Sequence, residues 1–95
     1  MSEKQAYEAK LQAQLDEWKA EIDRLKAKAD GAAADVKLAY HKQIDEISAM
    51  QKDAWKRLSE LKEVGDDAWQ DLRGGIEKAW DSLGQALKAA TSRFR

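Results

Sequence analysis

The chain has 95 residues, neither Cys nor Pro, and 17 basic residues against 18 acidic ones, for a formal net charge of −1. So balanced a charge disfavours nucleic acid as a partner, because proteins that bind phosphate backbones concentrate Lys and Arg. The lack of Cys excludes disulfides, thiol nucleophiles and thiolate metal sites. The rest of the composition is typical of long helices, so we predict an all-α fold in one domain, residues 1–95.

The first predicted helix begins near residue 3, because Ser2 followed by Gln5 matches the capping box that starts a helix. Apolar residues then recur in steps of three and four, the spacing of a heptad seam, at Tyr7, Leu11, Leu15, Trp18, Ile22, Leu25 and Ala29. In the leading interpretation this helix continues to about residue 63, since the stepping passes Gly31 without a slip and Ala-rich sequence favours helix. In the alternative interpretation the helix breaks near Gly31, because Asp30-Gly31 is a turn signal.

A short phrase, Ala-Trp with Leu three residues after the Trp, occurs three times, at residues 54–58, 68–72 and 79–83. The copies are spaced by 14 and 11 residues, at which a helix returns to nearly the same face. An aromatic stripe at such spacing usually belongs to a helical core, and the functional alternative is an apolar face for a partner helix or a membrane interface.

A turn is predicted at about residues 64–66, where Gly65 can adopt the left-handed conformation that ends a helix and Asp67 with Gln70 imitates a capping box. The helix predicted over about residues 67–93 is amphipathic, with one apolar side made of Trp69, Leu72, Ile76, Trp80, Leu83, Leu87 and Phe94. The leading fold is therefore a long antiparallel helical hairpin or coiled coil, in which Trp55 and Trp69 face each other. The alternative, with the further break near Gly31, is a three-helix bundle.

In the hairpin interpretation the second helix covers less than half of the first, so the seam from Leu11 to Ala29 needs another chain to bury it. We therefore predict a homo-oligomer, most simply a two-fold dimer. The residues expected on the oligomer or partner face are Leu11, Leu15, Trp18, Ile22, Leu25, Trp55, Trp69, Leu72, Ile76, Trp80, Leu83 and Leu87.

No catalytic, cofactor-binding or metal-binding residue is assigned, because acid–base and nucleophilic sites need a concave pocket and a slender helical array offers few. The single His, His41, lies one turn before Asp45, but this pair supplies two ligands where a closed metal site needs four. His41 is therefore interpreted as solvated or salt-bridged. We predict a protein that is not an enzyme and takes no cofactor and no small-molecule substrate.

The sequence shows no apolar leader segment and no run of 18 apolar residues, so we expect a soluble, cytoplasmic protein. Its predicted role is that of a structural or interaction protein built on a self-associating coiled coil. The alternative is a peripheral protein that binds a lipid surface through its C-terminal Trp-rich helix. Near-zero charge disfavours that alternative, because interfacial helices usually carry Lys and Arg on their polar face.

Four segments resemble small bacterial coiled-coil proteins described as stress-response or stress-induced: LDEWKAEIDRLKAK at residues 15–28, YHKQI at 40–44, DAWQDL at 67–72 and AWDSL at 79–83. The resemblance covers nearly the whole chain, and its most distinctive part is the two closing Ala-Trp phrases. It implies a helical fold and a role in stress, and it brings no catalytic residues. Gly31 is a departure, because that region is usually Lys/Ala-rich and helical in the family.

Overall fold

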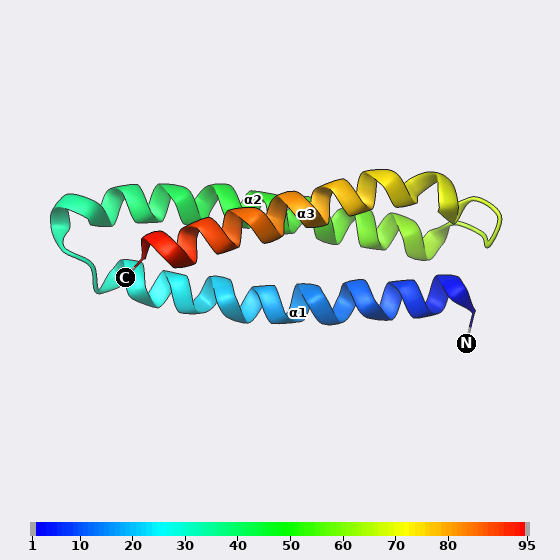
Figure 1. The fold of residues 1–95 in the computed structure, drawn as a ribbon, viewed down its shortest axis with the longest axis horizontal. Coiled ribbons are helices and arrows are strands. Elements are labelled where there is room, and N and C mark those ends of the chain that lie inside the picture. Colours follow the sequence, from blue (N-terminus) through cyan, green and yellow to red (C-terminus); the bar gives the residue numbers. More distant parts are fainter. Residues whose placement is uncertain (1, 95) are drawn as a thin grey trace.

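The computed structural model describes residues 2–94, which form three helices in the order α1 (Glu3–Asp30), α2 (Ala34–Glu63) and α3 (Trp69–Arg93). The helices α1 and α2 form an antiparallel hairpin, and α3 lies obliquely across one side of it, running in the same direction as α1 (Figure 1). The radius of gyration is 15.4 Å, larger than the roughly 12 Å of a compact domain of this length. The predicted all-α class is confirmed, in the form of an elongated three-helix bundle of 51 × 20 × 18 Å.

The start of α1 follows the sequence prediction. The backbone N–H of Gln5 donates to Ser2 Oγ at 3.1 Å, and the backbone N–H of Ser2 donates to Gln5 Oε1 at 3.2 Å. This reciprocal capping box satisfies two of the N–H groups that a helix start leaves without partners.

The continuous helix predicted over residues 3–63 is wrong, and the alternative with a break near Gly31 describes the chain. Asp30 ends α1, Gly31 keeps a right-handed backbone, and Ala33 is extended before α2 begins. Helix propensity and unbroken phase favoured continuity, but the turn lets α2 fold back onto the seam of α1. Burying a Leu or Ile side chain stabilises the fold by about 1.5–3 kcal/mol, so several such residues outweigh the local cost of a turn.

The break predicted near Gly65 is confirmed, but its details differ. Val64 is extended, the N–H of Ala68 donates to the carbonyl of Gly65 at 3.1 Å, and α3 begins at Trp69, two residues later than predicted. No described glycine has a positive φ, so Gly65 does not take the left-handed conformation. The predicted cap at Asp67 does not form either, since α3 starts after Ala68 without a side-chain cap. The chain leaves α2 at the extended Val64 and turns over residues 66–68 instead.

Apolar side chains alone form the buried core of the described residues. At each end of α3, an aromatic pair packs this part of the chain against another helix. Near its start, the Trp69 ring packs against Tyr7 of α1, with centroids 5.5 Å apart. Near its end, Phe94 stacks on Tyr40 of α2 at 4.1 Å.

The three Ala-Trp phrases differ in which of their residues is buried. In the first copy Ala54 is fully buried and Trp55 only half-buried, whereas Trp69 and Trp80 of the other copies lie in the core. The expectation that Trp55 and Trp69 face each other is wrong, because the ring packed on Trp69 is that of Tyr7. Trp55 lies eight residues before the end of α2, about 12 Å along the helix axis.

Candidate interaction surface

Nine of the twelve residues predicted for the partner face lie in the core of this chain: Leu11, Leu15, Ile22, Leu25, Trp69, Ile76, Trp80, Leu83 and Leu87. The prediction that these nine residues form a surface open to a partner is wrong. The turn after Asp30 lets the three helices pack these residues against one another. Trp18, Trp55 and Leu72 are half-buried and keep part of their surface in solvent.

The burial of these residues bears on both predicted partners, a second copy of the chain and a lipid surface. The α1 seam is covered by the chain itself, so it no longer requires a second copy, and the dimer stays a prediction that needs another basis. The apolar side of α3, proposed for lipid binding, packs inward, so α3 could offer it to a bilayer only by leaving the bundle. Within the described residues, no helix is both apolar and long enough to span a membrane.

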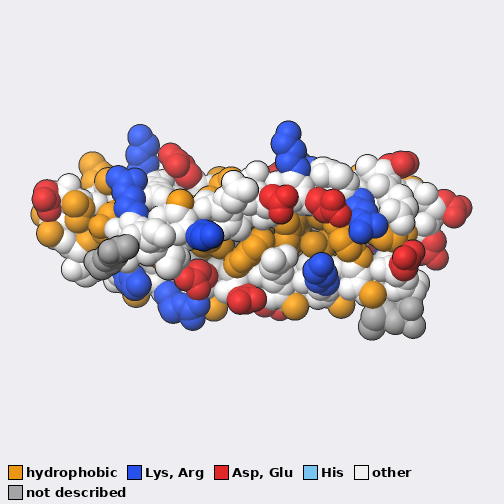
Figure 2. Space-filling view, viewed as in Figure 1, with side chains coloured by type: hydrophobic (Ala, Val, Ile, Leu, Met, Phe, Trp, Pro, Cys, Tyr) orange, Lys and Arg blue, Asp and Glu red, His pale blue; other side chains and the backbone are white. Residues whose placement is uncertain are grey.

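A groove runs along the surface between α1 and α3, from Tyr7 and Arg73 at one end to Glu21 and Thr91 at the other. We call it the α1–α3 groove. It consists of three consecutive hollows of about 380, 310 and 300 Å³, of which the first two share Trp80 and the last two share Trp18. Figure 2 shows apolar side chains in the valley between the two helices, with acidic and basic side chains on both sides.

Trp18 lines two of the three hollows of this groove and lies beside Gly84 of α3. Gly84 permits the approach, since a Cβ atom at this position would lie 3.3 Å from Trp18 Cζ2. Trp80 also lines the groove and is only 5% exposed, and its buried Nε1 has no acceptor in the described part of the chain. An unsatisfied buried N–H costs about 1–3 kcal/mol, so a hydrogen-bond acceptor here would add stability.

The rim of the groove carries charges of both signs. Lys10 and Glu17 on α1, and Asp81 and Lys88 on α3, all line the hollows. Within residues 2–94, none of these four side chains forms an ion pair or a hydrogen bond. They are therefore free to pair with charges on an occupant of the groove.

At the Tyr7 end, the groove is closed by a cluster of aromatic and charged side chains. The guanidinium of Arg73 lies 5.4 Å from the centroid of Tyr7 and 5.9 Å from that of Trp69, and Arg73 Nε donates to Glu77 Oε1 at 3.0 Å. Partial burial, followed by the nearby Glu77 carboxylate, raises the pKa of the Tyr7 hydroxyl, and Arg73 offsets part of this rise. The cluster holds the start of α3 against α1.

At the other end, Glu21 is bound by side chains from both helices. Arg24 donates to its carboxylate, and the Thr91 hydroxyl of α3 lies 3.3 Å from Glu21 Oε1. The hydrogen bond from Arg24 lowers the pKa of the partly exposed Glu21 carboxyl. These contacts fix the second end of the groove.

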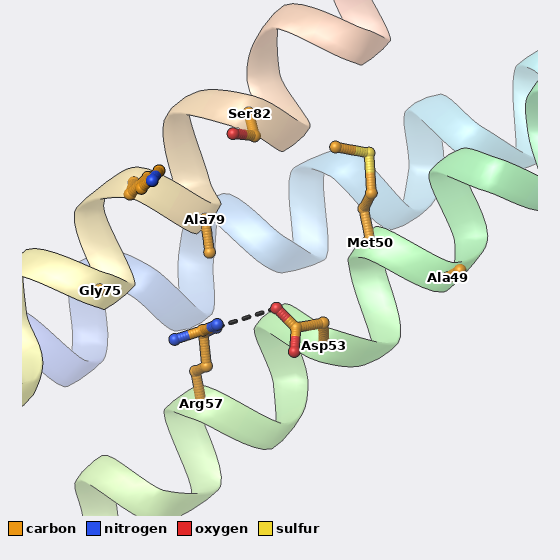
Figure 3. A pocket seen from close by; sticks show the side chains of 8 residues that line it. Ala49, Met50, Asp53, Arg57, Gly75, Ala79 and Ser82 are labelled. Carbon is orange, nitrogen blue, oxygen red and sulfur yellow. Dashed lines mark hydrogen bonds and ion pairs between the residues drawn. The ribbon is translucent and has the colours of Figure 1, made fainter.

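A second hollow, the α2–α3 groove, lies on the other side of α3 and has a volume of about 510 Å³ (Figure 3). Ala49 and Met50 of α2 and Ala79 of α3 give it an apolar surface. Arg57 projects into the gap from α2, and its Nε donates to Asp53 Oδ2 at 2.8 Å.

His41 contacts a carboxylate, but its partner is not the predicted Asp45. Its Nε2 lies 3.0 Å from Asp30 Oδ1, so the pair joins the end of α1 to α2 across the turn instead of linking His41 to Asp45. No group of three or more metal-ligating side chains occurs among residues 2–94. The predictions that the protein is not an enzyme and needs no metal remain untested.

Sequence reasoning missed the residues that shape the two grooves. The sequence patterns assigned no site role to Gly75, Gly84, Lys10, Glu17 or Arg57. A signal was present for the glycines, because a Gly inside an amphipathic helix costs about 1 kcal/mol and often marks a close approach.

No protein-family model, no curated protein and no solved structure matches this chain. The two grooves are therefore the structural basis for proposing a function. The resemblance in sequence to stress-related coiled coils adds an expectation about the biological setting.

Proposed function

We propose that the chain is a non-catalytic interaction protein that self-associates by packing its α1–α3 groove against the same groove of a second copy. The observation that carries this proposal is the groove itself, in which the partly exposed Trp18 lies close to the buried Trp80 among mostly polar and charged lining residues. Partly exposed Trp side chains at the middle of a surface are common anchors of protein interfaces.

The exposed area of the chain supports such an interface. The chain exposes 6225 Å², whereas a typical monomer of 10.7 kDa exposes about 5,500 Å². The excess of about 700 Å² is close to the roughly 800 Å² that each partner buries in a standard interface.

The charges on the α1 rim are self-complementary. Lys10 and Glu17 have opposite signs and lie seven residues apart, about 10 Å along α1. When the two-fold axis is perpendicular to α1, the two copies of α1 run antiparallel, so Lys10 of each copy can lie opposite Glu17 of the other. This arrangement would give four otherwise unpaired charges a partner.

The resemblance to small bacterial stress-response proteins supports a bacterial, cytoplasmic setting and a role in stress for this assembly. In that role the protein would act through the partners it holds together. This part of the proposal rests on the sequence segments at residues 15–28, 40–44, 67–72 and 79–83.

Sedimentation equilibrium or size exclusion with light scattering tests the proposal. We expect a concentration-dependent dimer that Trp18→Ala weakens by at least 30-fold, because truncating an anchoring Trp costs 2 kcal/mol or more. Trp55→Ala is the matched control, since Trp55 is also half-buried but lies outside the α1–α3 groove, so it should leave the dimer intact. A wild-type monomer at high micromolar concentration, or equal effects of the two substitutions, would overturn the proposal.

A further inference from the structure

The α2–α3 groove combines an apolar surface with a cationic end. Its volume of about 510 Å³ falls within the roughly 300–1,000 Å³ range of small-molecule sites. The groove lies on the opposite side of α3 from the proposed dimer surface, so an occupant here need not disturb self-association.

Arg57 lies at one end of this groove, where it is paired with Asp53. Its Nε is bound to Asp53, and its terminal nitrogens lie next to the α3 backbone at Gly75, where a Cβ atom would be only 3.2 Å from Nη1. The side chain nevertheless keeps 42% of its surface in solvent. A guanidinium has five N–H donors, so the two terminal nitrogens remain available for a carboxylate, which Arg binds in a bidentate manner.

The charges around the groove favour an anion. Arg57 and Lys78 are positive, and the one acidic side chain among the lining residues, Asp53, is already paired with Arg57. Lys78 forms no ion pair within residues 2–94. The lining side chains therefore carry a surplus of one positive charge, and the Glu60 carboxylate, which lies outside the lining, also acts on Arg57.

The apolar part of the groove lies beyond this charged end. Met50 is seven residues before Arg57 on α2, about 10 Å along the helix, and Figure 3 shows its side chain extending toward α3. Ala79 points into the same gap from α3 (Figure 3). An occupant must therefore have an anionic head and a slender apolar tail.

We propose that the α2–α3 groove binds a small alkyl carboxylate, whose head group pairs with Arg57 and whose chain lies along Met50 and Ala79. A carboxylate matches the planar fork of Arg57, and a single alkyl chain matches the narrow apolar strip between two helices. This binding activity is independent of the proposed self-association and uses different residues.

Titration of the full chain with decanoate, below its micelle concentration, tests this inference by methyl NMR. We expect saturable shifts at Met50, Ala49 and Ala79, and an affinity that falls by up to about fourfold for each CH₂ removed from the chain. Decanol, which lacks the charge, should bind at least tenfold more weakly. Shifts centred on Trp18, equal binding of decanol, or no saturable shift would overturn the proposal.

Substitutions assign the head-group site. Arg57→Gln should weaken decanoate binding by at least tenfold. Arg73→Gln is the matched control, because Arg73 also pairs through Nε with a carboxylate one turn away, at 3.0 Å, but lies in the other groove. It should change the affinity less than twofold. Ala79→Met fills the apolar strip and leaves the charges in place, so it should also abolish decanoate binding. Unchanged affinity in Arg57→Gln or in Ala79→Met would refute the assignment.

Discussion

Three glycines inside α3 provide a direct test of how this helix packs. A Cβ atom at Gly74 would meet nothing within 4 Å, one at Gly75 would lie 3.2 Å from the flexible end of Arg57, and one at Gly84 would lie 3.3 Å from Trp18. Because Ala is favoured over Gly by about 1 kcal/mol in a helix interior, the same substitution should have different effects at these positions.

Gly74→Ala should raise the free energy of unfolding by about 1 kcal/mol, or the melting temperature by about 5 °C, since nothing opposes the gain in helix propensity. Gly75→Ala should gain nearly as much, because the Arg57 guanidinium can shift by a few tenths of an ångström. Gly84→Ala forces the Trp18 ring to move, and crowding of this kind costs about 1–3 kcal/mol. We therefore expect Gly84→Ala to be neutral or to destabilise the protein by up to about 2 kcal/mol.

Urea denaturation followed by circular dichroism measures these differences. A double-mutant cycle sharpens the test, because in a Trp18→Ala background the Gly84→Ala substitution should regain most of the 1 kcal/mol from propensity. If Gly84→Ala stabilises the wild type as much as Gly74→Ala does, α3 does not pack against α1 at Trp18. The packing of α3 on α1 at this contact would then be refuted.

Two further predictions concern charge. Lys10→Glu should weaken the proposed dimer roughly tenfold at low salt, and adding Glu17→Lys should restore it, both measured by sedimentation. If the double variant does not recover the dimer, the α1 rims do not pair in an antiparallel manner. The pKa of Tyr7 is raised in the folded state, mainly by burial, so its contribution to stability is complete below about pH 10 and is lost as the pH rises further. Between pH 9 and pH 11 the wild type should therefore lose more stability than Tyr7→Phe, and parallel losses in urea titrations would contradict this.

The sequence was sufficient to predict the helical class, the start of α1 and the break near Gly65. These features depend on local chemistry, such as the Ser2 capping box and the 3–4 spacing of apolar residues, which the sequence shows directly. It was not sufficient to choose between a continuous helix and a turn at Gly31. That choice depends on the free energy gained when α2 and α3 bury the α1 seam, and this is a tertiary quantity that propensity alone does not contain.

The candidate surface was harder to predict for a related reason. The seam residues carry the strongest pattern in the sequence, but a strong apolar pattern marks whatever becomes buried, and in this chain its own helices bury it. The residues left for a partner are those at the edges of the seams, such as Trp18, where a side chain is covered by one neighbouring helix but not by two. Which edges stay open depends on the path of α3, and that path follows from the two turns.

The glycines of α3 connect the fold with both proposals. Gly75 and Gly84 are nine residues apart, and at about 100° per residue they project to opposite sides of the helix. Gly75 therefore faces Arg57 in the α2–α3 groove, and Gly84 faces Trp18 in the α1–α3 groove. Each glycine lowers the helix propensity of α3, and each brings one large side chain of a neighbouring helix close to its backbone. The two positions where α3 loses helix propensity are therefore the positions where it packs against a partly exposed side chain, which is Arg57 at Gly75 and Trp18 at Gly84.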